Sequence, residues 1–200
     1  HVVLSTLEGK VMGFGRNSFG QLGSSGKGLY PLPILLPDQD IIDFACGRHH
    51  SIFLSASGDV YGCGLNSEAQ LGGPDEGVAR RLTKISNLTN IVALSSGCWH
   101  SLYIDDEGKV WSTGSNQYGQ RGLEKGPSPQ TATIVPYISD AVQLSHGGHT
   151  SIVKDYQGNV YSFGAQSHGD YDFTGIYVPT KIPEASAIAH HRSKAKSAKK

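Results

Sequence analysis

Short apolar runs, separated by glycine and polar residues, recur along the whole chain. In one stretch, His50-Ser51-Ile52-Phe53-Leu54 is followed by the polar turn Ser57-Gly58-Asp59 and then by Val60-Tyr61-Gly62-Cys63-Gly64. Runs of this length are typical of strands, and a glycine between them supplies the positive φ that a hairpin turn needs. The pattern predicts a β-hairpin over residues 50–64. Long segments with the 3.6-residue period of a helical repeat are absent from the sequence.

The same hairpin pattern occurs four times at a nearly constant spacing. Its leading glycines are 49, 50 and 50 residues apart, and the copies are GKVMGFGRNSFGQLG from Gly9, GDVYGCGLNSEAQLG from Gly58, GKVWSTGSNQYGQRG from Gly108 and GNVYSFGAQSHGDYD from Gly158. A second block recurs with the same period as ACGRHHSIFLSASG, SSGCWHSLYIDDEG and HGGHTSIVKDYQG, each time after a short apolar run. About four short strands in about 50 residues match the size of a propeller blade.

The cycle G-x-x-H-S, then D/E-G-x-V-x-x-x-G-x-N-x-x-G-Q-L-G, resembles the repeat of the regulator of chromosome condensation family. The resemblance covers nearly all of residues 1 to about 190 and implies an all-β fold, with blades of a seven-bladed β-propeller beginning near residues 1, 50, 100 and 150. It weakens in the fourth copy, where Gly169-Asp170-Tyr171-Asp172 replaces Gly-Gln-Leu-Gly.

The length of the chain fits only part of such a ring. Seven blades at this period need about 350 residues, whereas the chain has 200. We therefore expect residues 1–189 to form four blades of a longer seven-bladed propeller. A ring completed by another polypeptide and a closed four-bladed ring are the alternatives.

The histidines do not predict a metal site or a catalytic site. His50 and His100 occupy equivalent positions of adjacent repeats, and such positions lie much farther apart than two ligands of one metal ion. We expect each imidazole to form a hydrogen bond between neighbouring strands instead. His100, Ser101 and Asp105 are likewise not expected to form a hydrolase set, and Asp105 is expected to be solvated in a hairpin turn. No catalytic residue and no cofactor is predicted.

The recurring amides and the cysteines also have structural interpretations. The asparagines fit a turn position and the glutamines recur at strand or loop junctions, so both sets are expected to stabilise the fold: Asn17, Asn66, Asn116, Gln21, Gln70 and Gln120. The three cysteines, Cys46, Cys63 and Cys98, contain no CxxC pair. Their odd number favours a reducing compartment within the cell, with nucleus, cytosol and organelle left open.

A formal net charge of zero hides an uneven distribution. Residues 190–200 contain five basic side chains and no acidic one, namely Arg192, Lys194, Lys196, Lys199 and Lys200. Without them, 12 basic residues remain against 17 acidic ones, so the body carries about −5. An acidic body is poorly suited to wrapping nucleic acid, which leaves the basic tail as the nucleic-acid contact if there is one. The tail is expected to be a disordered end, and no membrane partner is expected because no apolar run is long enough to span a bilayer.

The repeats differ from one another at two positions between the glycine and the histidine of each G-x-x-H-S block. These dipeptides are Arg48-His49, Cys98-Trp99 and Gly148-His149. The resemblance implies that they point to one face of the ring and contact partners there, which predicts a partner-binding face of Arg48, His49, Trp99 and His149. Tryptophan and arginine are enriched among the residues that dominate protein interfaces. The alternative is that Trp99 packs between blades.

Three functions are compatible with this pattern. The first, which we favour, is a non-enzymatic protein-interaction platform, such as a subunit or assembly factor of a larger complex. The second is a guanine-nucleotide exchange factor for a small Ran-like GTPase. The resemblance implies acidic face dipeptides and an insertion for that activity, whereas none of the three dipeptides contains Asp or Glu and the constant spacing leaves no room for an insertion. The third is a chromatin-associated propeller that uses the basic tail.

Overall fold

The protein folds into four antiparallel sheets. The structure, a computed structural model, describes residues 1–36, 40–73, 77–127, 129–167 and 173–183. The described strands are β1 (Val2–Ser5), β2 (Val11–Arg16), β3 (Leu29–Leu35), β4 (Ile41–Cys46), β5 (His50–Ser55), β6 (Val60–Leu65), β7 (Val78–Lys84), β8 (Ile91–Ser96), β9 (His100–Asp105), β10 (Val110–Gly114), β11 (Thr133–Ile134), β12 (Ala141–Gly147), β13 (Thr150–Asp155), β14 (Val160–Ser167) and β15 (Phe173–Lys181). Among these residues, no helix is long and apolar enough to cross a bilayer.

Each sheet is a meander of strands that are consecutive in sequence, as in a propeller blade. The sheet orders are β1-β2-β3, β4-β5-β6-β7, β8-β9-β10-β11 and β12-β13-β14-β15. The predicted all-β fold and the predicted hairpin over residues 50–64 are confirmed, since β5 pairs with β6 in antiparallel register. The first sheet has three described strands, whereas the other three sheets have four. Its first strand, β1, corresponds to the second strand of the other sheets (β5, β9 and β13). A strand equivalent to the inner strands β4, β8 and β12 is therefore not among the described residues of the first blade.

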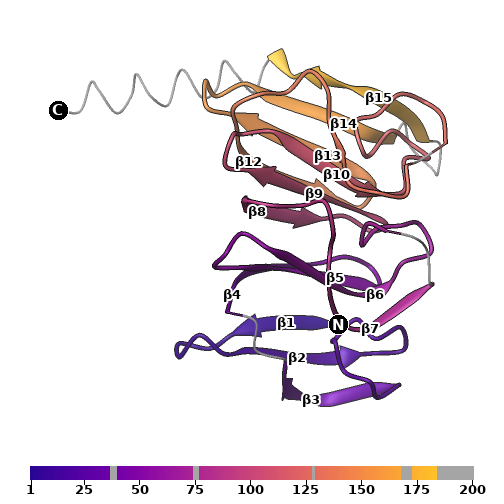
Figure 1. Ribbon diagram of the computed structural model, residues 1–200. Coiled ribbons are helices and arrows are strands. Elements are labelled where there is room, and N and C mark those ends of the chain that lie inside the picture. The colour runs from indigo at the N-terminus through magenta and orange to yellow at the C-terminus, as the bar shows by residue number, and fades with distance from the viewer. Residues whose placement is uncertain (37–39, 74–76, 128, 168–172, 184–200) are drawn as a thin grey trace, which may run out of the picture.

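The four sheets lie side by side as an open row. Figure 1 shows the sheet β1-β2-β3 at the bottom, the sheet β12-β13-β14-β15 at the top, and the other two between them. The inner strands follow one another, because β4 contacts β8 and β8 contacts β12. The end sheets lie at opposite ends of the row, so the described residues do not form a closed four-bladed ring.

The hydrophobic core lies between the sheets. All six residues of β5 are buried, and their side chains alternate between two neighbours, as strand geometry requires. Ile52 and Leu54 pack in the cluster shared with the third sheet, whereas Phe53 packs in the cluster shared with the first sheet. A third cluster joins the third and fourth sheets around Phe163. A strand buried on both faces explains why this segment is an apolar run without polar alternation.

One expectation about the hairpin turns is wrong. Asp105 is 7 % exposed rather than solvated. One oxygen of its carboxylate accepts hydrogen bonds from the backbone N–H groups of Glu107 and Lys109, and the other accepts one from Trp111 Nε1 at 2.8 Å. The carboxylate therefore closes the β9–β10 turn, and the indole on β10 covers it.

Glycine is required where the second strand of each hairpin ends. Gly114 has φ 96°, and a Cβ there would lie 2.3 Å from the carbonyl oxygen of Trp99. We expect Gly114→Ala to lower the free energy of unfolding by about 2 to 3 kcal/mol, because the positive φ is unfavourable for alanine and the contact is with backbone that cannot move aside. Gly9 is the control, since its φ is 78° but a Cβ would meet nothing within 4 Å. Gly9→Ala should cost about 1 kcal/mol in urea unfolding; equal losses in the two variants would contradict the steric argument.

Candidate protein-interaction face

The dipeptides form tight hairpin loops at one end of the blades. Arg48-His49 joins β4 to β5, and the Gly47 N–H donates to the His50 carbonyl at 2.9 Å. Cys98-Trp99 joins β8 to β9 in the same way, with 3.0 Å between the Gly97 N–H and the His100 carbonyl oxygen. Gly148-His149 occupies the same position between β12 and β13. Two-residue loops hold their side chains in few conformations, so they can present a defined surface.

The three loops are also hydrogen-bonded to one another. The Arg48 N–H donates to the Cys98 carbonyl at 3.3 Å, and the Cys98 N–H donates to the Gly148 carbonyl at 2.8 Å. These bonds connect loops from three separate sheets into one continuous backbone ladder. We call the surface formed by these three dipeptides, by Arg16 at the end of β2 and by the adjoining turn residues Phe19, Glu68 and Tyr118 the loop face.

Three of the four predicted face residues lie together. The Arg48 guanidinium carbon lies 5.6 Å from the centre of the Trp99 ring, a cation–π distance. The His49 ring meets Trp99 edge-on with 5.8 Å between ring centres. Arg48 is exposed, whereas His49 and Trp99 are half-buried. Trp99 is therefore part of a surface cluster and is neither fully exposed nor buried between blades.

His149, the fourth predicted residue, lies beside a different aromatic side chain. Its ring is 5.4 Å from that of Tyr118, and Phe19 occupies the corresponding place beside His49 at 4.9 Å. Sequence reasoning did not identify Phe19 and Tyr118. The available signal was that one repeat slot, two residues after the recurring asparagine, contains Phe19, Glu68 and Tyr118 and so varies as the dipeptides do.

The recurring asparagines and glutamines fix the turns that present these aromatic rings. Asn17 Oδ1 accepts from the Leu22 N–H at 2.9 Å, and Asn17 Nδ2 donates to two carbonyls of the same turn. Gln21 Oε1 accepts from the Phe19 N–H at 3.0 Å. Asn116 and Gln120 repeat this arrangement around Tyr118, and Asn66 and Gln70 repeat its backbone contacts around Glu68. The prediction that these amides stabilise the fold is confirmed.

The buried histidines support the loops from below. Nε2 of His50 lies 3.0 Å from Ser101 Oγ of the next sheet, and Nε2 of His100 lies 2.8 Å from Ser151 Oγ. The expected hydrogen bonding between neighbouring strands is confirmed. Burial lowers the pKa of His50 to about 3, so its imidazole is neutral at physiological pH. No group of three or more potential metal ligands lies within the part of the chain that the structure describes.

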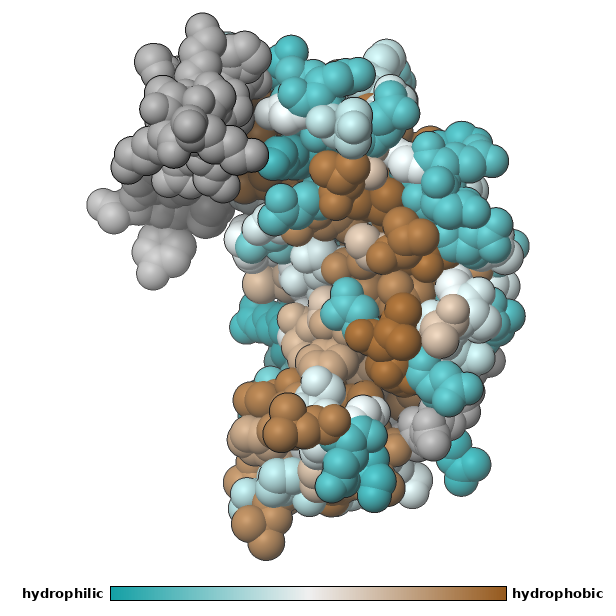
Figure 2. Space-filling model, turned by 90° about the vertical axis from the view of Figure 1, so that its left-hand side faces the viewer, coloured by the Kyte–Doolittle hydropathy of each residue, from teal (hydrophilic) through white to brown (hydrophobic). Residues whose placement is uncertain are grey.

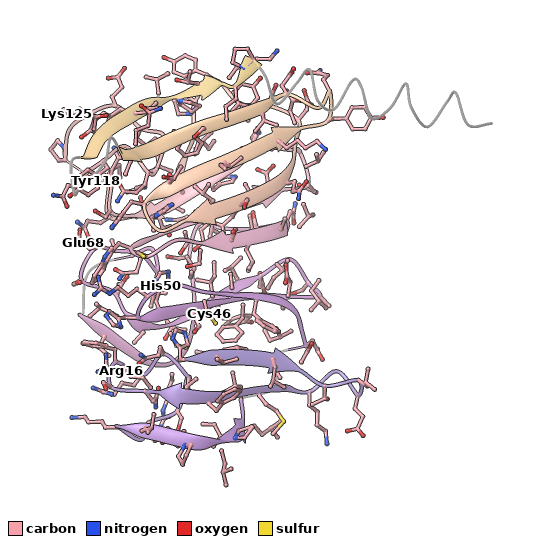
Figure 3. The ribbon with its side chains drawn as sticks, turned by 180° about the vertical axis from the view of Figure 1, so that it is seen from behind. Arg16, Cys46, His50, Glu68, Tyr118 and Lys125 are labelled. Carbon is pink, nitrogen blue, oxygen red and sulfur yellow. The ribbon has the colours of Figure 1, made fainter. Side chains whose placement is uncertain are left out.

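The charge of the loop face comes from arginine and not from histidine. Burial, followed by the nearby Arg48 and Arg16, lowers the pKa of His49. Burial and Arg48 also lower the pKa of His149. Both imidazoles are therefore neutral at pH 7 and act as aromatic and hydrogen-bonding groups. Figure 3 shows Arg16, Glu68, Tyr118 and Lys125 along the same edge of the blades, with His50 inside.

The basic tail is the remaining feature predicted from the sequence. Its residues, Arg192, Lys194, Lys196, Lys199 and Lys200, lie outside the described residues. The three cysteines lie within the described residues and are free thiols.

Comparison with known families matches the repeats. Two profiles described as "Regulator of chromosome condensation (RCC1) repeat" match the chain, one at residues 8–54 and 57–104 and the other at residues 41–70 and 91–120. Protein RCC2 of Homo sapiens is 40% identical over 75 residues, which are 36% of this chain and 14% of that protein. The RCC2 homolog of Xenopus laevis is also 40% identical over 75 residues, which are 36% of this chain and 15% of that protein.

Solved structures share the fold at low sequence identity. Human WBSCR16 superposes with a TM-score of 0.74 at 22% identity, covering 86% of this chain and 47% of that one. Yeast RCC1 (Prp20), solved bound to Kap60, superposes with a TM-score of 0.77 at 22% identity, and the match covers 90% of this chain and 46% of that one. Prp20p from Saccharomyces cerevisiae, described with its binding properties to Gsp1p and histones, superposes with a TM-score of 0.76 at 21% identity. The match covers 90% of this chain and 48% of that one. The chain therefore spans about half the length of these propellers, and its matched segment covers about a seventh of the RCC2 proteins.

Proposed function

Because the chain belongs to the regulator of chromosome condensation (RCC1) repeat family, we propose that its loop face is a non-enzymatic docking surface for a protein partner. The observation that carries the proposal is the cluster of Arg48, His49 and Trp99, in which an exposed guanidinium covers a half-buried indole. Arginine and tryptophan are enriched among interface hot spots. Related propellers have recorded protein partners, since Prp20 was solved with Kap60 and is described as binding Gsp1p and histones.

The rigidity of the loop face supports the same proposal. The backbone ladder between the three dipeptide loops and the amide-fixed turns leave few torsions to be ordered on binding. A preordered surface loses little conformational entropy when a partner binds, so more of the contact energy contributes to affinity. We expect the partner to lie across three adjacent blades, with the Arg48–Trp99 pair near the centre of the contact. A subunit or assembly factor of a larger complex fits such a surface.

The Arg48→Ala, Trp99→Ala double variant tests this function. We expect it to lose partner capture by about 30-fold or more, which corresponds to the roughly 2 kcal/mol that defines a hot spot. The measurement is pull-down of interacting proteins from cell extract, followed by titration of the recovered partner. Tyr156→Ala is the matched control, because Tyr156 is an aromatic residue that is 83% exposed in the β13–β14 turn at the other end of the blade. Unchanged capture, or equal loss in the control, would contradict the assignment of the loop face.

Exchange-factor activity is the second candidate because Prp20p is described with its binding to Gsp1p. Within the loop face, Glu68 is the acidic side chain, and the dipeptides contain none. Accelerated release of bound nucleotide from a Ran-like GTPase would establish exchange activity and contradict the purely non-enzymatic proposal. Chromatin binding through residues 190–200 and a reducing compartment within the cell remain predictions from the sequence.

A further inference from the structure

The end of the blades opposite the loop face is a second continuous surface. It consists of the tight turns of the β1–β2, β5–β6, β9–β10 and β13–β14 hairpins and of the first residues of the inner strands; we call it the hairpin face. The turns contact the next blade, since the Ile91 N–H donates to the Gly58 carbonyl at 3.1 Å and the Ala141 N–H donates to the Gly108 carbonyl at 2.9 Å. Adjacent blades are therefore held in fixed positions at this end as well.

A row of apolar side chains runs across the hairpin face. The register of each inner strand skips one residue, so that Ile42, Val92 and Val142 are bulged out of the pairing with the neighbouring strand. These three residues are 65%, 58% and 52% exposed. Figure 2, which views this face, shows a band of hydrophobic surface along the molecule. A β-bulge redirects a side chain, and its repetition in three blades makes the row a regular feature of the fold.

The apolar row has an acidic border. Exposed carboxylates lie in the hairpin turns and at the starts of the inner strands, namely Glu8, Asp40, Asp43, Asp106 and Asp140. Two lysines of this face are already paired, Lys84 with Asp59 and Lys109 with Glu107. Asp40 has an interaction of its own. Lys10 and Lys181 are further exposed lysines in the described part of the face, and the four other carboxylates, those of Glu8, Asp43, Asp106 and Asp140, outnumber them. An apolar strip with negative flanks matches a segment that combines aliphatic and basic residues.

The chain itself supplies such a segment at this face. The Ile182 N–H donates to the carbonyl of Val160, the first residue after the β13–β14 turn, at 2.8 Å. The last described residues therefore lie at the hairpin face and not at the loop face. The sequence continues as Glu184-Ala-Ser-Ala-Ile188-Ala-His-His-Arg-Ser-Lys-Ala-Lys-Ser-Ala-Lys-Lys200, with an aliphatic part before the five basic residues.

We propose that residues 184–200 bind across the hairpin face of their own chain, with Ile188 on the apolar row and the basic residues against its acidic border. The lengths agree with this assignment. Three strand spacings of about 4.8 Å separate β15 from β12, or about 14 Å, and any five residues of fully extended chain can span about 16 Å. An extended segment of this length is thus long enough for Ile188 to contact Val142 and for the following basic residues to contact Asp140 and Asp106. This contact leaves the loop face open, so it is independent of the proposed function.

Trypsin cleavage of the full chain tests this contact. The digestion is run at low ionic strength, and mass spectrometry measures the rate of cleavage after Arg192, Lys194 and Lys196. We expect this rate to be about tenfold lower than in a synthetic peptide of residues 184–200, because a bound segment must dissociate before it is cleaved. The Val92→Lys, Val142→Lys double variant should restore most of the free-peptide rate, since it introduces positive charge into the row. Raising the salt concentration to about 0.5 M should have a similar effect by screening the basic residues from the acidic border.

Leu29→Lys is the matched control, because Leu29 is 72% exposed and begins β3 at the loop-face end of the first blade. It adds the same charge and should leave the protection unchanged. Cleavage of the wild-type chain at the free-peptide rate would overturn the proposal. Protection that increases with protein concentration would also overturn it, because the segment would then bind a second copy. Protection that Leu29→Lys removes as effectively as the double variant would show a non-specific charge effect and contradict the assignment to the row.

Discussion

Between pH 7.5 and pH 4.5, the free energy of unfolding is expected to fall by about 6 to 8 kcal/mol, because the buried His50 and His100 and the half-buried His146 stay neutral in the folded protein. Burial lowers the pKa of His50 to about 3 and that of His146 to about 4, and it holds the pKa of His100 well below its usual value. In the unfolded chain each imidazole takes up a proton below about pH 6.5. Stability is therefore complete above this pH and falls as the pH decreases toward the folded-state values, by about 2 to 3 kcal/mol per histidine at pH 4.5.

The contacts of these histidines explain why protonation of their imidazoles is unfavourable in the folded protein. The rings of His100 and His146 are 4.7 Å apart, so two imidazolium charges there would repel each other. Urea unfolding at half-unit pH steps measures the loss, and the slope gives the number of protons taken up. His146→Gln should reduce the loss by about a third, because it removes one of the three titrating groups. A stability that stays constant from pH 7 to pH 5 would show that the folded protein accepts these protons and would contradict the prediction.

Replacement of Arg121 is expected to have the second largest effect. Its side chain is fully buried, and within the described residues neither of the two ion pairs involves it. Its guanidinium donates to four carbonyl oxygens and two hydroxyl oxygens instead, those of Ser112, Gly114, Pro129, Thr131 and Thr133. Desolvation lowers its pKa to about 10, so the group is still charged at pH 7. We expect Arg121→Ala to cost about 4 kcal/mol, from the cavity and the lost hydrogen bonds together.

Arg121→Leu separates these two contributions. Leu22 and Leu71 occupy the same slot in the first two repeats and are buried there, so leucine fits the backbone. The leucine variant should lose only about 2 kcal/mol, because it fills the volume and removes a desolvated charge but leaves carbonyl groups without a donor. Thermal and urea unfolding of both variants provide the comparison. A leucine variant as stable as the wild type would show that desolvation of the guanidinium cancels its hydrogen bonds.

The repeat in the sequence determines much of this structure. The hairpins, the blades, and the roles of His50, Asn17 and Gln21 follow from residues that recur at a fixed spacing, because a recurring residue makes the same local bond in each blade. The burial of Asp105 was not predicted, because the sequence does not show that a polar hydrogen of an aromatic side chain on the next strand reaches the turn carboxylate, as Trp111 does at Asp105 and Tyr161 does at Asp155. The environment of Arg121 was not predictable either. The sequence shows GQRG in place of GQLG, but it does not show which carbonyl groups surround the arginine side chain.

The candidate surfaces were predictable only in part. The dipeptides of the loop face were found because they vary within a constant frame, and the structure brings Arg48, His49 and Trp99 together. Phe19 was missed because its contact with His49 depends on a turn from the preceding blade. The apolar row was missed for another reason: a bulge shifts the two-residue alternation of a strand by one position, so that Ile42 faces outward although the run around it suggests a buried strand.

The position of the core between sheets has a consequence for cooperativity. Each interior blade is stabilised by two neighbours and each end blade by one, so four blades in an open row share three hydrophobic clusters. In arrays with nearest-neighbour coupling, a blade with neighbours on both sides is more stable than the same blade with one neighbour. The Arg48–Trp99 contact spans the second and third blades, which are the two interior ones. The proposed partner would thus bind two blades that are each packed against a neighbour on both sides, and its binding would couple the stability of those two blades.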